Sequence, residues 1–225
     1  YSYLQDNFRY VSIQLGIGGY KTFDANFVDL KKYGDCKALS NYMQACLDAV
    51  GIKSYAALIN ATYNKEPVDP AFPHNSFNHV IICVPGKKDS IWLECTSKSA
   101  DFGVLGSFTE NRNALLITPD GGALVATPKS KASDNTFNMT TKVMLQEDAS
   151  GKSESILKTT GLYKETVIDN ILDEKKDDQK EYLVNSLGVL QRDNVELDID
   201  AGNDSAKTSF ELSIEKIPEF SAGNK

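Results

Sequence analysis

Tyr33-Gly34-Asp35-Cys36-Lys37 is followed directly by Ala38-Leu39-Ser40-Asn41-Tyr42-Met43, which puts a cysteine between a tight turn and a run with helical periodicity. At a helix N-terminus, unpaired backbone N–H groups and the helix dipole favour the thiolate form of a cysteine. The stretch therefore predicts a cysteine nucleophile. A lone cysteine is more often a small buried hydrophobe, so the prediction depends on the partners that the rest of the chain supplies.

The residues after Cys36 predict a core helix that ends near Gly51. Their apolar positions recur in steps of three and four, which makes one buried stripe: Leu39, Met43, Cys46, Leu47 and Val50. Cys36 belongs to the first turn of this helix, where its side chain can face a cleft while the body of the helix is packed.

Composition excludes several classes of function. The chain has 225 residues and a formal net charge of −7, with acidic and basic residues interleaved. Nucleic-acid binding needs basic clusters, and this balance gives no attraction to anionic membranes, so neither partner is expected. No apolar run is as long as a membrane span, and no signal peptide opens the chain. Because Tyr1 stands where an initiator Met would, we expect an excised segment of a longer protein.

The cysteines and histidines argue against a metal or redox site. The chain has four cysteines and two histidines, His74 and His79, and no cysteine pair has CxxC spacing. We therefore expect no metal and no cofactor. The three cysteines other than Cys36 lie in apolar stretches and are expected to be buried free thiols: Cys46, Cys83 and Cys95.

The region around the cysteine helix predicts an α+β domain over residues 1–130. Residues 1–10 are expected to be the end of a helix, and residues 24–32 to be a short helix. The glycine-rich stretch Gly16-Ile17-Gly18-Gly19-Tyr20 is interpreted as a turn and not as a phosphate-binding loop. Residues 62–76 form a polar loop with three prolines, either a lid or, as we favour, a surface excursion. Strands are expected over 10–15, 54–60, 79–84, 90–95, 114–117 and 123–125.

A predicted hairpin brings a histidine and a carboxylate together. The turn Pro85-Gly86-Lys87-Lys88-Asp89 suits an antiparallel pair of strands, in which the start of the first lies near the end of the second. His79 and Glu94 occupy these two positions. Cysteine, histidine and carboxylate are the groups that thiol-based acyl transfer requires: a nucleophile, a proton carrier and a residue that orients the imidazole.

The second half of the chain carries no obvious chemistry. After a polar linker over 128–135, no histidine or cysteine occurs. We expect a smaller β-rich α+β module over residues 136–225, with strands over 136–146, 153–160, 195–199 and 207–214 and a helix over 167–190.

Four motifs, in order, resemble the transglutaminase-like superfamily, and more narrowly its bacterial members from multidomain secreted or periplasmic proteins, commonly of Bacteroidetes. They are Tyr10-Val-Ser-Ile-Gln-Leu-Gly-Ile-Gly-Gly-Tyr20, Tyr33-Gly-Asp-Cys-Lys37, Phe77-Asn-His-Val80 and Trp92-Leu-Glu-Cys-Thr96. The resemblance implies a papain-like core over 1–130, with the nucleophile helix packed on an antiparallel sheet. It makes Cys36 the nucleophile, His79 the base and Glu94 the third member, and it implies flanking domains and an envelope location.

The chain departs from this family at two positions. The third member is usually Asp, one methylene shorter than Glu94, and Ala38 stands where another acidic residue is common. An oxyanion also needs a donor: we expect the backbone N–H of Cys36, with the Gln14 side chain as a further candidate. Trp92 and Asn78 are candidates for the cleft wall, although a sole tryptophan on a hairpin is more often core and Asn78 more often shapes the local turn.

Two functions remain open. In the first, Cys36 forms a thioester with a peptide or protein substrate, donated by a Gln side chain or a peptide bond, and water or an amine completes the transfer. We favour hydrolysis over cross-linking, and the chain has no calcium-loop pattern. In the second, the chain is a non-catalytic module that holds a peptide or glycan or acts as a scaffold.

Overall fold

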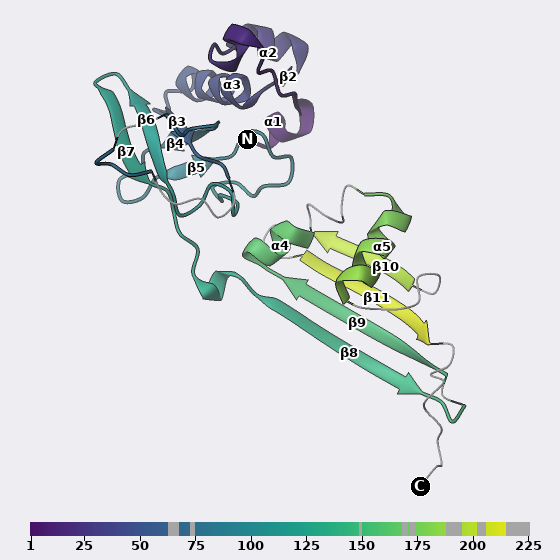
Figure 1. Cartoon of the computed structure of the whole chain (residues 1–225). Helices are drawn as coiled ribbons and strands as arrows, with labels where there is room; N and C mark the ends of the chain where they lie inside the picture. Colours follow the sequence, from purple (N-terminus) through teal and green to yellow (C-terminus); the bar gives the residue numbers. More distant parts are fainter. Residues whose placement is uncertain are drawn as a thin grey trace. The chain divides into compact units, whose positions relative to one another are not determined.

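The computed structural model describes residues 1–62, 68–72, 75–148, 150–167, 171, 174–187, 195–201 and 206–214 (Figure 1). The chain divides into two compact units, Tyr1–Lys129 and Ser130–Lys225. Each unit combines helices with an antiparallel sheet, as the α+β class predicts. Parts of the 62–76 loop and of the predicted 167–190 helix lie outside the described residues. No described helix has the length and apolar character needed to cross a membrane.

Three helices open the N-terminal unit in its described part: α1 (Ser2–Asn7), α2 (Ala25–Lys31) and α3 (Cys36–Ala49). Each of the two longer helices begins at an aspartate that accepts a backbone N–H of its first turn, as N-caps do. Asp24 Oδ1 accepts from Asn26 N at 2.8 Å, and Asp35 Oδ1 accepts from Ala38 N at 3.0 Å. The predicted helices over 24–32 and from Cys36 onward are confirmed.

The described part of this unit contains a five-stranded antiparallel sheet in the order β5-β4-β3-β6-β7. Its strands are β3 (Tyr55–Ile59), β4 (His79–Val84), β5 (Ile91–Leu93), β6 (Asn113–Thr118) and β7 (Gly121–Ala126). Their positions confirm the predicted strands, and the β4–β5 pairing confirms the predicted hairpin. In this hairpin Ile82 pairs with Leu93 and Cys83 with Trp92.

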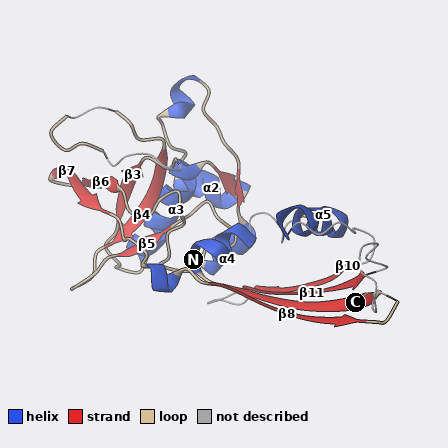
Figure 2. Ribbon diagram, turned by 60° about the horizontal axis from the view of Figure 1, so that its bottom comes forward, coloured by secondary structure: helices blue, strands red, loops and turns tan. Residues whose placement is uncertain are grey.

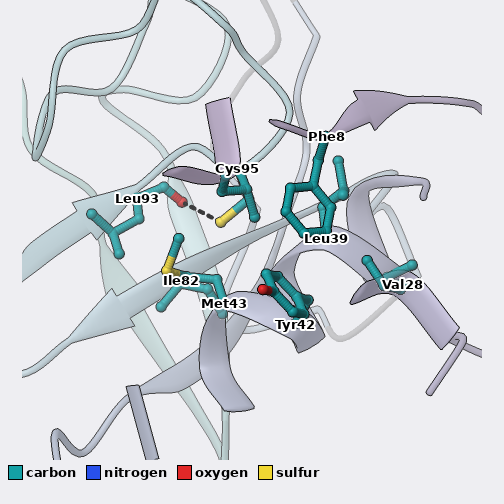
Figure 3. Close-up of a cluster of buried hydrophobic side chains, with 10 residues drawn as sticks. Phe8, Val28, Leu39, Tyr42, Met43, Ile82, Leu93 and Cys95 are labelled. Atoms are coloured by element: carbon teal, nitrogen blue, oxygen red, sulfur yellow. Dashed lines mark hydrogen bonds between the residues drawn. The ribbon is translucent and has the colours of Figure 1, made fainter. Parts of the chain in front are cut away.

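Both faces of the sheet are covered by apolar side chains. On the face toward α3, Leu39 and Met43 pack with Ile82 and Leu93 (Figure 3). On the other face Ile81, Cys83 and Trp92 pack with Leu105, Ala114 and Leu116. Neighbouring residues of β4 thus enter different cores, because side chains alternate along a strand. This double burial fixes the register that positions His79.

Two sequence predictions for this unit are wrong. The strand expected over 10–15 is only β1 (Arg9–Tyr10), which pairs in parallel with β2 (Tyr33–Gly34), and the 3₁₀ turn η1 (Gly16–Gly19) follows. Val11 and Ile13 are half-buried but Leu15 is 89% exposed, so the apolar alternation does not continue as a strand with one buried face. The buried stripe predicted for α3 does not reach its end: Cys46 is exposed and Val50 is 70% exposed, whereas Leu47 still packs against the core.

The C-terminal unit has a four-stranded antiparallel sheet in the order β10-β11-β9-β8 within its described residues. Its elements are η2 (Ala132–Asp134), β8 (Phe137–Leu145), β9 (Gly151–Thr159), α4 (Gly161–Val167), α5 (Lys176–Leu187), β10 (Val195–Ala201) and β11 (Ala206–Ile214). The four predicted strands are confirmed. Leu157, Val167, Ile171 and Ala206 form a core beneath helices that lie on one face of the sheet (Figure 2).

The single helix predicted over 167–190 is wrong. One helix, α4, already ends at Val167, and Glu174 and Lys175 are not helical before α5 begins. The start of α4 depends on a distant residue, because Leu162 N donates to Asn135 Oδ1 at 2.7 Å. A cap supplied by the linker leaves no signal in the helix's own sequence.

Candidate active site

Cys36 is the first residue of α3 and is 5% exposed. Directly before it, Asp35 caps the helix and forms an ion pair with Lys37. Gly34 allows the chain to turn into the helix closely, since a Cβ at this position would lie 2.8 Å from the Cβ of Ala38. The local sequence therefore fixes the thiol at the helix N-terminus, where backbone N–H groups are unpaired.

His79 and Glu94 are in direct contact across the β4–β5 hairpin. His79 is the first residue of β4, and Glu94 directly follows β5. The His79 Nε2 atom lies 3.1 Å from Oε1 and 2.9 Å from Oε2 of Glu94. The Glu94 side chain is 1% exposed and that of His79 is 11% exposed. The extra methylene of glutamate, compared with aspartate, is thus compatible with a contact to the imidazole.

The electrostatics of this pair favour a charged imidazole. Burial of His79 opposes protonation, but hydrogen bonds to Cys36 and Glu94, together with their negative charge, outweigh it and raise the pKa of His79 to about 10. Since Nε2 faces the carboxylate, the other ring nitrogen, Nδ1, is the one left for Cys36. The three groups thus form one interacting cluster of thiol, imidazole and carboxylate.

Thr96 is part of this cluster and was not singled out by sequence reasoning. Its backbone N–H and its hydroxyl both donate to Oε1 of Glu94, at 3.1 and 2.6 Å. The backbone oxygen of Glu94 accepts from the Tyr1 hydroxyl at 2.8 Å. Side chain and main chain of Glu94 are therefore both fixed.

The predicted cleft-wall residues have other surroundings. Trp92 is 4% exposed and packs in the core on the sheet face away from α3. Asn78 accepts from Ala61 N at 2.7 Å and donates to Thr62 Oγ1 at 3.1 Å, so it fixes the turn before β4. These two residues shape the scaffold of the hairpin.

Phe108 is an aromatic residue beside the imidazole, and its ring centroid lies 6.1 Å from that of His79. Sequence reasoning did not single it out, because it belongs to the loop between β5 and β6. Gln14, the candidate oxyanion donor, is exposed in the irregular segment after β1. No described hydrogen bond joins Gln14 to the cluster, whereas the backbone N–H of Cys36 lies at the helix start, where N–H groups lack intrahelical partners.

The remaining cysteines differ from Cys36 in their surroundings. Burial raises the pKa of Cys95 to about 12 and also raises the pKa of Cys83. Neither thiol is therefore activated. The described part of the chain contains no group of three or more His, Cys, Asp or Glu residues that could hold a metal ion.

Comparisons with known proteins give no further indication. No protein-family model matches the chain, and no curated protein or solved structure is significantly similar to it.

Proposed function

We propose that this chain catalyses thiol-dependent acyl transfer or amide hydrolysis, with Cys36 as nucleophile, His79 as proton carrier and Glu94 as the residue that orients the imidazole. The observation that carries the proposal is the contact of both Glu94 oxygens with Nε2 of His79, an imidazole that also interacts with Cys36. A papain-like core is part of the proposal. It is supported by a helix that begins at Cys36 and packs on an antiparallel sheet.

The chemistry would proceed in two steps. The Cys36 sulfur attacks the carbonyl carbon of an amide, either a peptide bond or a Gln side chain, and the backbone N–H of Cys36 stabilises the oxyanion. The C–N bond breaks as His79 gives its proton to the leaving nitrogen, and a thioester remains on Cys36. Water or an amine then attacks the thioester carbon and gives a proton to His79, and the C–S bond breaks, which releases the acyl product and restores the Cys36 thiolate. We favour water as acceptor and a peptide or protein as substrate.

Thiol reactivity tests the proposal. Iodoacetamide alkylation at pH 6, resolved by peptide mass spectrometry, compares Cys36 with the exposed Cys46 within the same molecule. Because Cys36 is less accessible than Cys46, faster alkylation of Cys36 cannot arise from exposure. We expect Cys36 to react much faster than Cys46 and this excess to be lost in His79→Ala. Equal or slower reaction of Cys36 would contradict an activated thiol.

The near-complete burial of Cys36 favours a second candidate, a non-catalytic module that binds a peptide or glycan on the same fold. Labelled peptides and pairs of Gln and amine substrates distinguish the two candidates, with Cys36→Ala as control. Turnover that disappears in Cys36→Ala supports the enzyme. Binding that persists in Cys36→Ala without any turnover by the wild type supports the binding module.

A further inference from the structure

We infer that Thr96 is a positioning residue of the proposed site: its two donors hold one carboxylate oxygen of Glu94 so that the longer glutamate side chain keeps facing the imidazole of His79. The inference rests on the proposed function for its role in chemistry, and on four contacts between these side chains for its geometry.

The buried carboxylate of Glu94 needs hydrogen-bond donors from the protein. The Glu94 carboxylate is almost completely removed from water, and a buried carboxylate must find hydrogen-bond donors in the protein. Thr96 supplies two donors to Oε1, while His79 Nε2 is closest to Oε2. The hydroxyl contact of 2.6 Å has the length of a charge-assisted O–H···O⁻ bond.

The hydroxyl of Thr96 restricts the conformational freedom of the Glu94 side chain. Glutamate has one more rotatable bond than aspartate, so its carboxylate has more ways to turn from a partner. Removing the Thr96 hydroxyl leaves Oε1 with the backbone N–H and a shared Nε2 contact. The carboxylate then gains freedom to leave the position in which both of its oxygens reach the imidazole.

The backbone around Thr96 is fixed by neighbouring contacts. Cys95, on its N-terminal side, is buried in the core toward α3, while Glu94 and Thr96 alternate to the opposite side of the chain. Tyr1 donates to the backbone oxygen of Glu94, and Gln5 Nε2 donates to that of Ser97 at 3.2 Å. The backbone is thus fixed on both sides of Thr96, which makes its two donors rigid.

The test compares Thr96→Val, which removes the hydroxyl and keeps the shape, with Thr96→Ser, which keeps the hydroxyl. Two readouts are used: the NMR titration of the His79 imidazole, assigned with a His74→Ala variant, and the pH profile of Cys36 alkylation. In Thr96→Val we expect the pKa of His79 to fall and alkylation at pH 6 to slow about tenfold, the effect of losing one hydrogen bond to a charged group. Thr96→Ser should restore both readouts.

The controls separate positioning from folding. Thr22→Val changes an exposed threonine whose hydroxyl contacts only the neighbouring Phe23 among the described hydrogen bonds, and it should leave both readouts unchanged. If Thr96→Val does not fold, Thr96→Ala removes the same hydroxyl without placing a methyl group there. A titration and a pH profile equal to wild type in the folded variant would overturn the inference, as would a Thr96→Ser variant that restores neither readout.

The two proposals fail in different ways. If wild-type Cys36 is no more reactive than Cys46, the proposed function fails, while the His79 titration still decides the role of Thr96. If Cys36 is reactive and Thr96→Val matches wild type in both readouts, only the role of Thr96 is lost.

Discussion

The raised pKa of His79 predicts that the N-terminal unit becomes less stable as the pH rises from about 6.5 to about 10. The folded chain holds this imidazole with a pKa of about 10, whereas 6.5 is the ordinary value. A group that binds its proton more tightly when folded stabilises the fold fully below its unfolded pKa. That contribution is lost as the pH passes through the folded pKa.

The magnitude follows from the same two values. Each pKa unit corresponds to about 1.4 kcal/mol, so the difference amounts to about 5 kcal/mol of unfolding free energy. Solvent screening reduces this little, because the His79 side chain is 11% exposed. Since domains are stable by about 5–15 kcal/mol, the loss would be a large part of the total.

The assay is urea unfolding at fixed pH values, followed by tryptophan fluorescence. Trp92 is the chain's single tryptophan and is buried in the N-terminal unit, so its signal reports on that unit. His79→Gln is the reference, because its side chain is neutral throughout. Lysines and tyrosines titrate in both proteins, so the difference between the two unfolding free energies reports on His79 and on its contacts with Cys36 and Glu94.

We expect that difference to shrink by several kcal/mol between pH 6.5 and 10, at a nearly constant rate across the interval. Parallel curves for the two proteins would refute the reasoning, because they would mean that Glu94 and Cys36 do not hold a proton on the imidazole. Glu94→Gln removes one of the causes of the raised pKa, and should move the loss of stability to lower pH.

Three further variants test the segment that carries the thiol. Asp35→Ala removes the N-cap contact to Ala38 and should lower the unfolding free energy by about 1–2 kcal/mol in urea titrations, with partial recovery in Asp35→Asn. Gly34→Ala places a Cβ 2.8 Å from that of Ala38. It should cost about 1–3 kcal/mol and slow Cys36 alkylation, whereas unchanged values for both would contradict a close approach here. Ser40→Ala removes a 3.0 Å hydrogen bond to the Val80 oxygen and should cost about 1 kcal/mol by the same titration without changing the reactivity of Cys36.

The contact between His79 and Glu94 was predictable because it depends on local rules. A short turn fixes the hairpin, the period of two fixes which side chains share a face, and both cores penalise a register slip. The helix start at Cys36 was predictable for a similar reason, since Asp35 and Gly34 stand directly before it.

The surroundings of the site depend on residues that are distant in sequence, so the local pattern of the hairpin could not predict them. Trp92 is on the same strand face as Glu94, but it is core because it belongs to an apolar cluster that includes Leu105, from the loop between β5 and β6. Phe108 reaches the imidazole from a loop fixed at its far end, where Thr127 Oγ1 donates to the Thr109 oxygen at 2.9 Å. The sequence of the hairpin encodes neither the burial of Trp92 nor the position of Phe108 beside His79.

The energetics of a buried ion pair give one more argument for chemistry at this site. Removing two charges from water costs several kcal/mol per ion before their attraction is counted, and well-packed apolar residues often stabilise a fold equally well. His79 and Glu94 nevertheless lie together in an interior whose other residues are largely apolar, with a third reactive group, Cys36, beside them. A fold selected for stability alone has little use for this combination. Acyl transfer through a thiolate requires an imidazole that gives its proton in one step and takes a proton in the next, and a partner that keeps this imidazole in place.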